Sequence, residues 1–249
     1  MVPDRGRWLV GLLLAALLVF AAGCGRAASD VTKAEEPVTP PALPAAEPGL
    51  TLDSWVNPRD LRELVAAFAG LDYVWGVIED GAETDQFEVA YRFLGEEAVE
   101  GRNTSKVSFS IAQGDARHEL LLWLDPEGNA VRFELDGVQQ DPMMAQHFHF
   151  WFLGPFLWVD QYEVHTILTT GRPGYDMQIG GGERVSFGKA TAEVRTVKAS
   201  WSEAGQRVGY KWSIGDFGKL QMLVGWQMDL DVGAQAGGIF LRITEVETR

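Results

Sequence analysis

Alternation of apolar and polar residues constrains this chain more than any other feature of its sequence. It is clearest where Val208, Tyr210, Trp212 and Ile214 alternate with Gly, Lys and Ser, and again over residues 220–228. Successive side chains of a strand point to opposite faces of a sheet, so a period of two is typical of strands with one buried face. The same alternation recurs in residues 87–93, 107–111, 120–124, 131–135, 162–168, 192–197 and 239–246.

Short segments with turn chemistry separate these predicted strands. Asp125-Pro126-Glu127-Gly128-Asn129 lies between residues 120–124 and 131–135, and therefore predicts a hairpin. Strands at this spacing with short Gly-rich turns favour an antiparallel meander. We expect a mainly β (α+β) fold in which a curved antiparallel meander forms a half-barrel. One N-terminal helix and one apolar helical insertion on the concave face complete it.

The N-terminal helix is predicted just before the first strand. Asn57 is a suitable N-cap, Pro58 suits the first turn, and Gly70 ends the helical pattern. Between them lies one apolar stripe, made of Leu61, Leu64, Val65 and Phe68. A short helix of this kind has to pack on the sheet that follows it.

The apolar insertion covers residues 143–159. Asp141-Pro142 predicts a helix from Pro142 to about Leu153, with a second short turn after Pro155. A helix that is apolar nearly all round is buried on most sides, so we expect it against the concave face. Two interpretations stay open: a plug that completes the core, or a wall over a site for a hydrophobic ligand such as an acyl chain. In the second interpretation the lining residues are Met143, Met144, Phe148, Phe150, Trp151, Phe152, Phe156, Leu157 and Trp158.

The N-terminus has the pattern of a signal peptide. Arg5 and Arg7 precede an apolar run from Trp8 to Phe20, which is short for a membrane span of roughly 20 residues. The segment Phe20-Ala21-Ala22-Gly23-Cys24 resembles a bacterial lipobox, and Cys24 is the only cysteine of the chain. The resemblance implies cleavage before Cys24, a diacylglycerol on its sulfur and an acyl group such as palmitate on the new amine. A plain secretory cleavage site beside an incidental cysteine is the alternative.

These patterns divide the chain into three parts. Residues 1–23 are the predicted lipoprotein signal peptide, residues 24–51 the lipidated cysteine with a Pro/Ala/Glu-rich linker, and residues 52–249 a single domain. We expect the domain at the cell membrane, lipid-anchored on the extracytoplasmic face. The formal net charge of −14 argues against a nucleic-acid partner, because phosphate contacts need clusters of Lys and Arg.

Catalytic signatures are missing from the sequence. It has no G-x-S-x-G, H-E-x-x-H or phosphate-binding glycine motif, so we predict no enzyme and no cofactor. His147 and His149, with Glu163 and His165, have a spacing that suits metal ligands on strands. In a helix, however, His147 and His149 point about 200° apart. We therefore predict no metal site.

The order of these features is similar to that of the LolA-like superfamily of exported lipoproteins and lipoprotein carriers. The resemblance rests on the capped helix, the strand Tyr73-Val74-Trp75-Gly76-Val77, residues 87–95, the hairpin over residues 119–135 and the apolar insertion. It covers roughly residues 57–168. It implies a half-barrel closed by helices over a hydrophobic cavity that holds acyl chains.

Two functions follow as hypotheses. The domain binds a lipid or acyl ligand in its half-barrel, or it is a non-enzymatic interaction or sensory domain with a filled concave face. In the second case its partner is another envelope protein.

Overall fold

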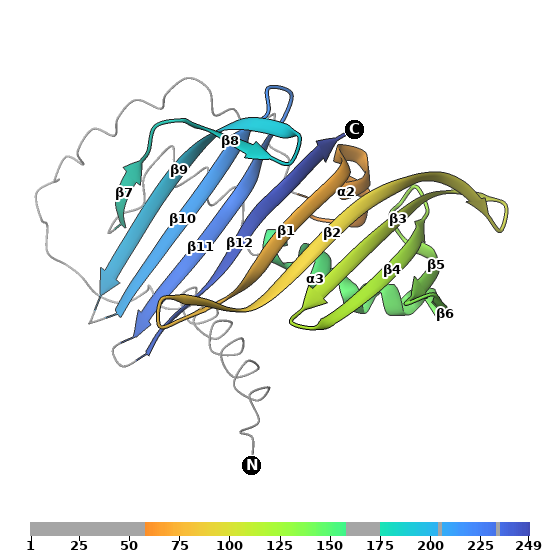
Figure 1. Ribbon diagram of the computed structural model, residues 1–249, viewed down its shortest axis with the longest axis horizontal. Helices are drawn as coiled ribbons and strands as arrows, with labels where there is room; N and C mark the ends of the chain where they lie inside the picture. Colours follow the sequence, from red (N-terminus) through yellow and green to blue (C-terminus); the bar gives the residue numbers. More distant parts are fainter. Residues whose placement is uncertain (1–57, 158–174, 204–205, 233–234) are drawn as a thin grey trace, which may run out of the picture. The chain divides into compact units, whose positions relative to one another are not determined.

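The described residues form one antiparallel sheet with two helices and a 3₁₀ turn (Figure 1). The computed structural model describes residues 58–157, 175–203, 206–232 and 235–249. All of them belong to one unit, Leu43–Arg249. The first half of the described sheet is made of β1 (Phe68–Glu79), β2 (Ala82–Val99), β3 (Arg102–Gln113), β4 (Ala116–Leu124), β5 (Ala130–Leu135) and β6 (Val138–Gln140). The second half is made of β7 (Tyr175–Ile179), β8 (Glu183–Phe187), β9 (Ala190–Glu203), β10 (Gln206–Asp216), β11 (Gln221–Val232) and β12 (Gln235–Thr248).

The strand order shows two meanders joined side by side. From edge to edge it is β6-β5-β4-β3-β2-β1-β12-β11-β10-β9-β7, and β8 pairs with the other end of β9. The first and last strands, β1 and β12, pair in the middle of the sheet (Figure 1). The described sheet is open, since its two edges do not meet. The predicted mainly β fold with a curved antiparallel meander is therefore confirmed.

Two-residue turns explain why consecutive strands pair. Asp80-Gly81, Glu100-Gly101 and Asp136-Gly137 all have positive φ at both residues. This backbone conformation is that of a type I′ turn, whose twist matches the twist of the paired strands.

The predicted hairpin between β4 and β5 is also confirmed. Its turn is closed by the Asp125 carboxylate, which accepts hydrogen bonds from the backbone N–H groups of Glu127 (3.1 Å) and Asn129 (2.8 Å). Gly128 takes a positive φ of 89° that a residue with a side chain adopts only with strain. The Asx turn thus sets the register of the hairpin.

The first helix is α2 (Leu61–Ala67), and it is shorter than the sequence suggests. Asp60, not Asn57, caps it: the Asp60 carboxylate accepts from the Glu63 backbone N–H at 2.7 Å. Asn57 itself lies outside the described residues. At the other end Phe68 already pairs with Thr248 in β12, so strand pairing ends the helix before Gly70.

The apolar insertion begins as a 3₁₀ turn, η2 (Pro142–Met144), and continues as α3 (Ala145–Leu157). Asp141 caps the turn by accepting from the Met143 backbone N–H at 2.9 Å. The helix passes through Pro155 instead of ending at Leu153. Within the same turn of helix the Tyr73 hydroxyl donates to the backbone carbonyl of Phe152, which ties this part of α3 to the sheet.

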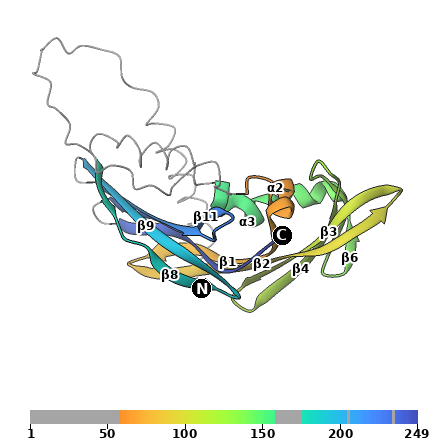
Figure 2. The same ribbon diagram turned by 90° about the horizontal axis from the view of Figure 1, so that it is seen from above.

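Both helices lie on the concave face of the sheet (Figure 2). Leu61, Leu64 and Val65 of α2 are buried there, as are Phe152 and Leu153 of α3. The short strands β6, β7 and β8 were not predicted from the sequence. The strand predicted over residues 162–168 lies outside the described residues.

Candidate functional site

The concave face of β1–β5 is filled by aromatic side chains from α3. Phe152 stacks on Phe109 of β3, with 3.9 Å between ring centroids, and is fully buried. Phe156 meets the Tyr73 ring edge-on at 5.2 Å, and Phe148 lies 5.6 Å from Phe133. Stacked and edge-to-face rings at these distances leave no room for a ligand between them. This part of the half-barrel is a packed core.

The predicted lining residues fall into three groups. Phe152 and Phe156 are buried in the core, and Phe148 is half-buried beside it. Met143 and Met144 instead point to solvent and are 64% and 42% exposed. The side chains of Phe150, Trp151, Leu157 and Trp158 lie outside the described residues, and so does Cys24.

A second apolar area occupies the concave face of β7–β12. Met177, Ala199, Tyr210, Met228 and Ile239 lie opposite one another in a single row across five strands. All except Ala199 are half-buried. The Tyr210 and Trp212 rings stack at 5.3 Å, so the next row is also aromatic. Alternation predicted β9–β12, but neither β7 nor the alignment of these apolar residues in rows.

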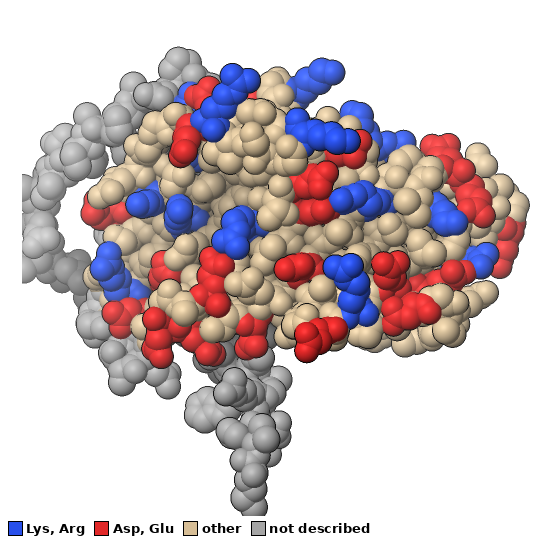
Figure 3. Space-filling model, in the orientation of Figure 1, with Lys and Arg blue, Asp and Glu red and all other residues tan. Residues whose placement is uncertain are grey.

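The convex face is covered by interspersed acidic and basic side chains (Figure 3). Arg92 bridges Asp72 and Glu245, and Arg242 pairs with Glu83 at 3.0 Å. The hydrogen bond from Arg92 to Asp72 raises the pKa of the guanidinium. Such partly exposed pairs contribute little stability each.

The buried indole ring of Trp123 in β4 lies among charged side chains of the convex face. Trp123 is 3% exposed and lies beneath Lys106 and Arg132, whose charged groups are 4.7 and 4.5 Å from the ring centroid. Its N–H donates to Glu97 at 3.0 Å and lowers the pKa of that carboxylate. The two cations over the Trp123 ring and the Glu97 carboxylate that accepts from its N–H therefore form one cluster of matched charges.

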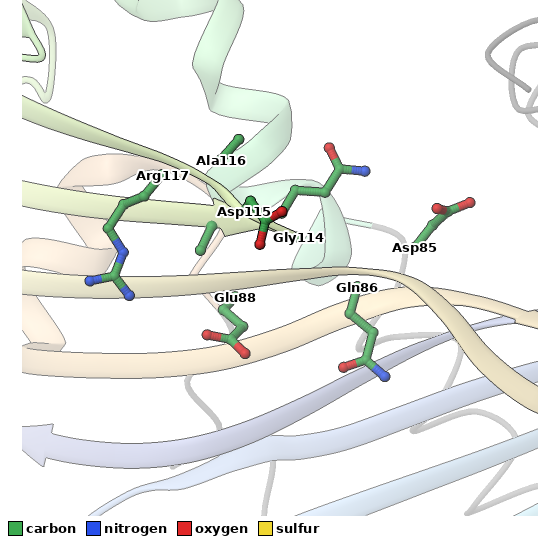
Figure 4. A pocket seen from close by; sticks show the side chains of 9 residues that line it. Asp85, Gln86, Glu88, Gly114, Asp115, Ala116 and Arg117 are labelled. Carbon is green, nitrogen blue, oxygen red and sulfur yellow. The ribbon is translucent and has the colours of Figure 1, made fainter.

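A polar pocket of about 610 Å³ opens on the convex face where β2, β3 and β4 run together. Asp85, Glu88, Asp115 and Arg117 contribute charged groups to it (Figure 4). The strand register places Ala112 between Glu88 and Arg117. No sequence signal predicted this pocket, because its residues come from two hairpins and belong to no motif.

Among the described residues, no group of three or more His, Cys, Asp or Glu side chains could hold a metal ion. His118 pairs with Asp136 at 2.8 Å, and His147 is exposed. Within the same ranges, no helix has the length and hydrophobicity of a membrane span.

Comparison with known proteins gives structural similarities only. No protein-family model matches the chain, and no curated protein matches it either. A structure of the Pseudomonas aeruginosa MucA/MucB complex aligns with a TM-score of 0.30 and 17% identity over 76% of this chain. The alignment covers 54% of that chain, so this chain spans about half its length.

A second similar structure is a putative exported protein with a YmcC-like fold from Bacteroides fragilis. Its TM-score is 0.24 and its identity 6%, over 72% of this chain and 96% of that one. At TM-scores of 0.30 and below, these similarities do not define a family for the chain.

Proposed function

We propose that this protein is an exported lipoprotein, held at the extracytoplasmic face of the cell membrane by a lipid on Cys24, whose domain acts by binding another envelope protein. The lipobox-like segment supports the anchor. The observation that carries the binding role is the packing of Phe152 on Phe109, because the filled concave face of β1–β5 leaves the outer surface and edge of this half for binding. We propose no catalytic role.

The partner contacts the domain at the sheet edge formed by β6 and η2. Val138, Met143 and Met144 are exposed there by 60%, 64% and 42%. Methionine side chains adapt to varied apolar surfaces, and large exposed apolar residues that lie together mark interaction sites. Strand β6 is short and lies at the edge of the sheet formed by the described residues, where edge strands offer backbone groups to a partner.

Photo-crosslinking in the living host tests this proposal. A photoreactive residue at position 143 is expected to give one discrete adduct with an envelope protein, and Met144→Gln to reduce its yield. Leu94 is the matched control site, since it is 50% exposed but lies on β2, away from this edge. A discrete adduct from position 94 but none from position 143 would refute this contact surface.

Binding of a lipid or acyl chain is the second candidate function. It is favoured by the half-buried apolar row through Met177, Tyr210, Met228 and Ile239 on the concave face. The apolar insertion, whose residues Phe152 and Phe156 fill the neighbouring part of the concave face, would then form one wall of the ligand site. Delipidated protein should take up a fluorescent fatty acid with defined stoichiometry, and Met228→Gln should weaken that uptake. Absence of saturable uptake by folded protein would remove this candidate.

A further inference from the structure

The convex pocket brings opposite charges together across a floor of small side chains. Glu88 of β2 lies opposite Ala112 of β3, and Ala112 lies opposite Arg117 of β4. With a strand spacing near 4.8 Å, the Glu88 and Arg117 backbones are about 10 Å apart. Their side chains extend to the same side of the strands (Figure 4). The Ala112 methyl group fills little of the space between them.

Local backbone geometry shapes the end of the pocket that lies near Asp85 and Asp115. Residues Asp85 and Gln86 form a bulge in β2, where the register shifts between Trp75 and Val77, and Asp85 has a positive φ of 44°. On the other side the β3–β4 hairpin turns tightly at Gly114-Asp115. A bulge aims side chains out of the regular pleat. Asp85 and Asp115 therefore both border the same hollow.

Among the described residues, the charged side chains of this pocket make no ion pair with one another or with a neighbour. In the described part of the chain, Glu88, Asp115 and Arg117 form neither an ion pair nor a side-chain hydrogen bond, unlike the neighbouring Arg92 and Arg242. Glu88 and Arg117 could reach across Ala112, yet they stay apart. Within the part of the chain that the structure describes, the pocket thus presents a guanidinium and carboxylates that are not paired with one another.

This arrangement specifies the chemistry of a ligand. A guanidinium binds a carboxylate through two parallel hydrogen bonds, and carboxylates accept charge-assisted bonds from ammonium groups. Three carboxylates, from Asp85, Glu88 and Asp115, stand against one guanidinium, so the charged lining sums to −2. A ligand with one carboxylate and two ammonium groups complements this distribution.

We propose that the pocket binds a free basic amino acid of the lysine type. The ligand carboxylate pairs with Arg117, and its two ammonium groups reach the carboxylates of Glu88 and of the Asp85–Asp115 end. This binding activity goes beyond the proposed envelope interaction and does not depend on it, because the two surfaces share no residue.

Calorimetric titration of the purified full chain in detergent micelles, at low ionic strength, tests the inference. L-Lysine should bind saturably with one site per chain. Norleucine lacks the side-chain ammonium and 1,5-diaminopentane lacks the carboxylate, so each should bind at least about tenfold more weakly. Arg117→Gln should weaken lysine binding by about tenfold and should not weaken diaminopentane binding, which abolishes the preference between the two.

Matched control variants lie at the opposite end of the same strand pair. Arg102→Gln and Glu96→Gln each remove an exposed charge from β3 or β2 without touching the pocket, and should bind lysine like the unaltered protein. Three results would overturn the inference: no saturable lysine binding, equal affinity for lysine and diaminopentane, or full lysine affinity in folded Arg117→Gln.

Discussion

The hydroxyl of Tyr73 joins the sheet to α3 by donating to the backbone carbonyl of Phe152. Both residues are buried, and burial raises the pKa of the Tyr73 phenol well above its ordinary value. Tyr73→Phe keeps the ring but leaves the carbonyl without its donor. We expect this change to lower the free energy of unfolding by about 1–3 kcal/mol in urea titrations.

Tyr91→Phe is the matched comparison for Tyr73→Phe. In the unaltered protein the Tyr91 hydroxyl donates to the backbone carbonyl of Phe68 at 3.3 Å, which is long for such a hydrogen bond. The weaker geometry predicts a smaller loss of stability. Equal or greater stability of Tyr73→Phe relative to the unaltered protein would show that the bond to α3 contributes nothing.

The Asp136 carboxylate is expected to make the stability of the fold depend on pH in the acid range. Its carboxylate accepts from the backbone N–H of Glu119 and bonds to His118, both at 2.8 Å, and the first of these contacts is the larger cause of its lowered pKa. A carboxylate with a lowered folded pKa stabilises the protein above its unfolded pKa of about 3.9, and this contribution is lost as pH falls through the folded value. Asp136→Asn should therefore show a shallower fall of the melting temperature between about pH 5 and pH 2.

Asp80→Asn provides the control for Asp136→Asn. Asp80 and Asp136 both begin an Asp-Gly turn, with φ of 50° and 51°, and asparagine tolerates that conformation. The Asp80 variant should keep the acid slope of the unaltered protein. If both variants change the slope equally, the turn and not the charge is responsible.

The helical element α3 is held by its aromatic face. Phe152 is fully buried on Phe109, so Phe152→Ala removes a large ring from a packed site and should cost about 3–5 kcal/mol. Met143→Ala is the control, because its side chain is 64% exposed and the cost should stay within about 0.5 kcal/mol. Thermal or urea unfolding measures both. A loss for Phe152→Ala no larger than that for Met143→Ala would mean that α3 is not part of the core.

Elements with strong alternation could be predicted, and short or displaced ones could not. Strands β10 and β11 each alternate over many residues, and the Asp125 turn predicted its hairpin. Strand β6 has only three residues, too few for a period to emerge. The start of α2 was misplaced because Asp60 is as suitable a cap as Asn57, and the Asp60 side chain accepts from the Glu63 backbone N–H.

At the level of the whole molecule, the pairing of β1 with β12 decides the architecture. Trp75 lies opposite Leu241 and Tyr73 opposite Ile243, so residues from the first and last strands share two adjacent core rows. Alternation gives each strand an apolar face but carries no information on which distant strand it meets. For the same reason the sequence could not predict the convex pocket, which depends on the register of Glu88, Ala112 and Arg117.

The lipid on Cys24 is the remaining whole-molecule prediction. The chain as a whole has a formal net charge of −14, which does not attract it to an anionic membrane, so the acyl chains are expected to be the sole anchor. In the native host, labelled palmitate should be incorporated into the unaltered protein and not into Cys24→Ser. The variant should then leave the membrane fraction, or keep its signal peptide and run larger on a gel. Its melting temperature should be unchanged, because residue 24 precedes the folded domain. A cleaved Cys24→Ser protein that stays with the membrane would show that another contact holds it there.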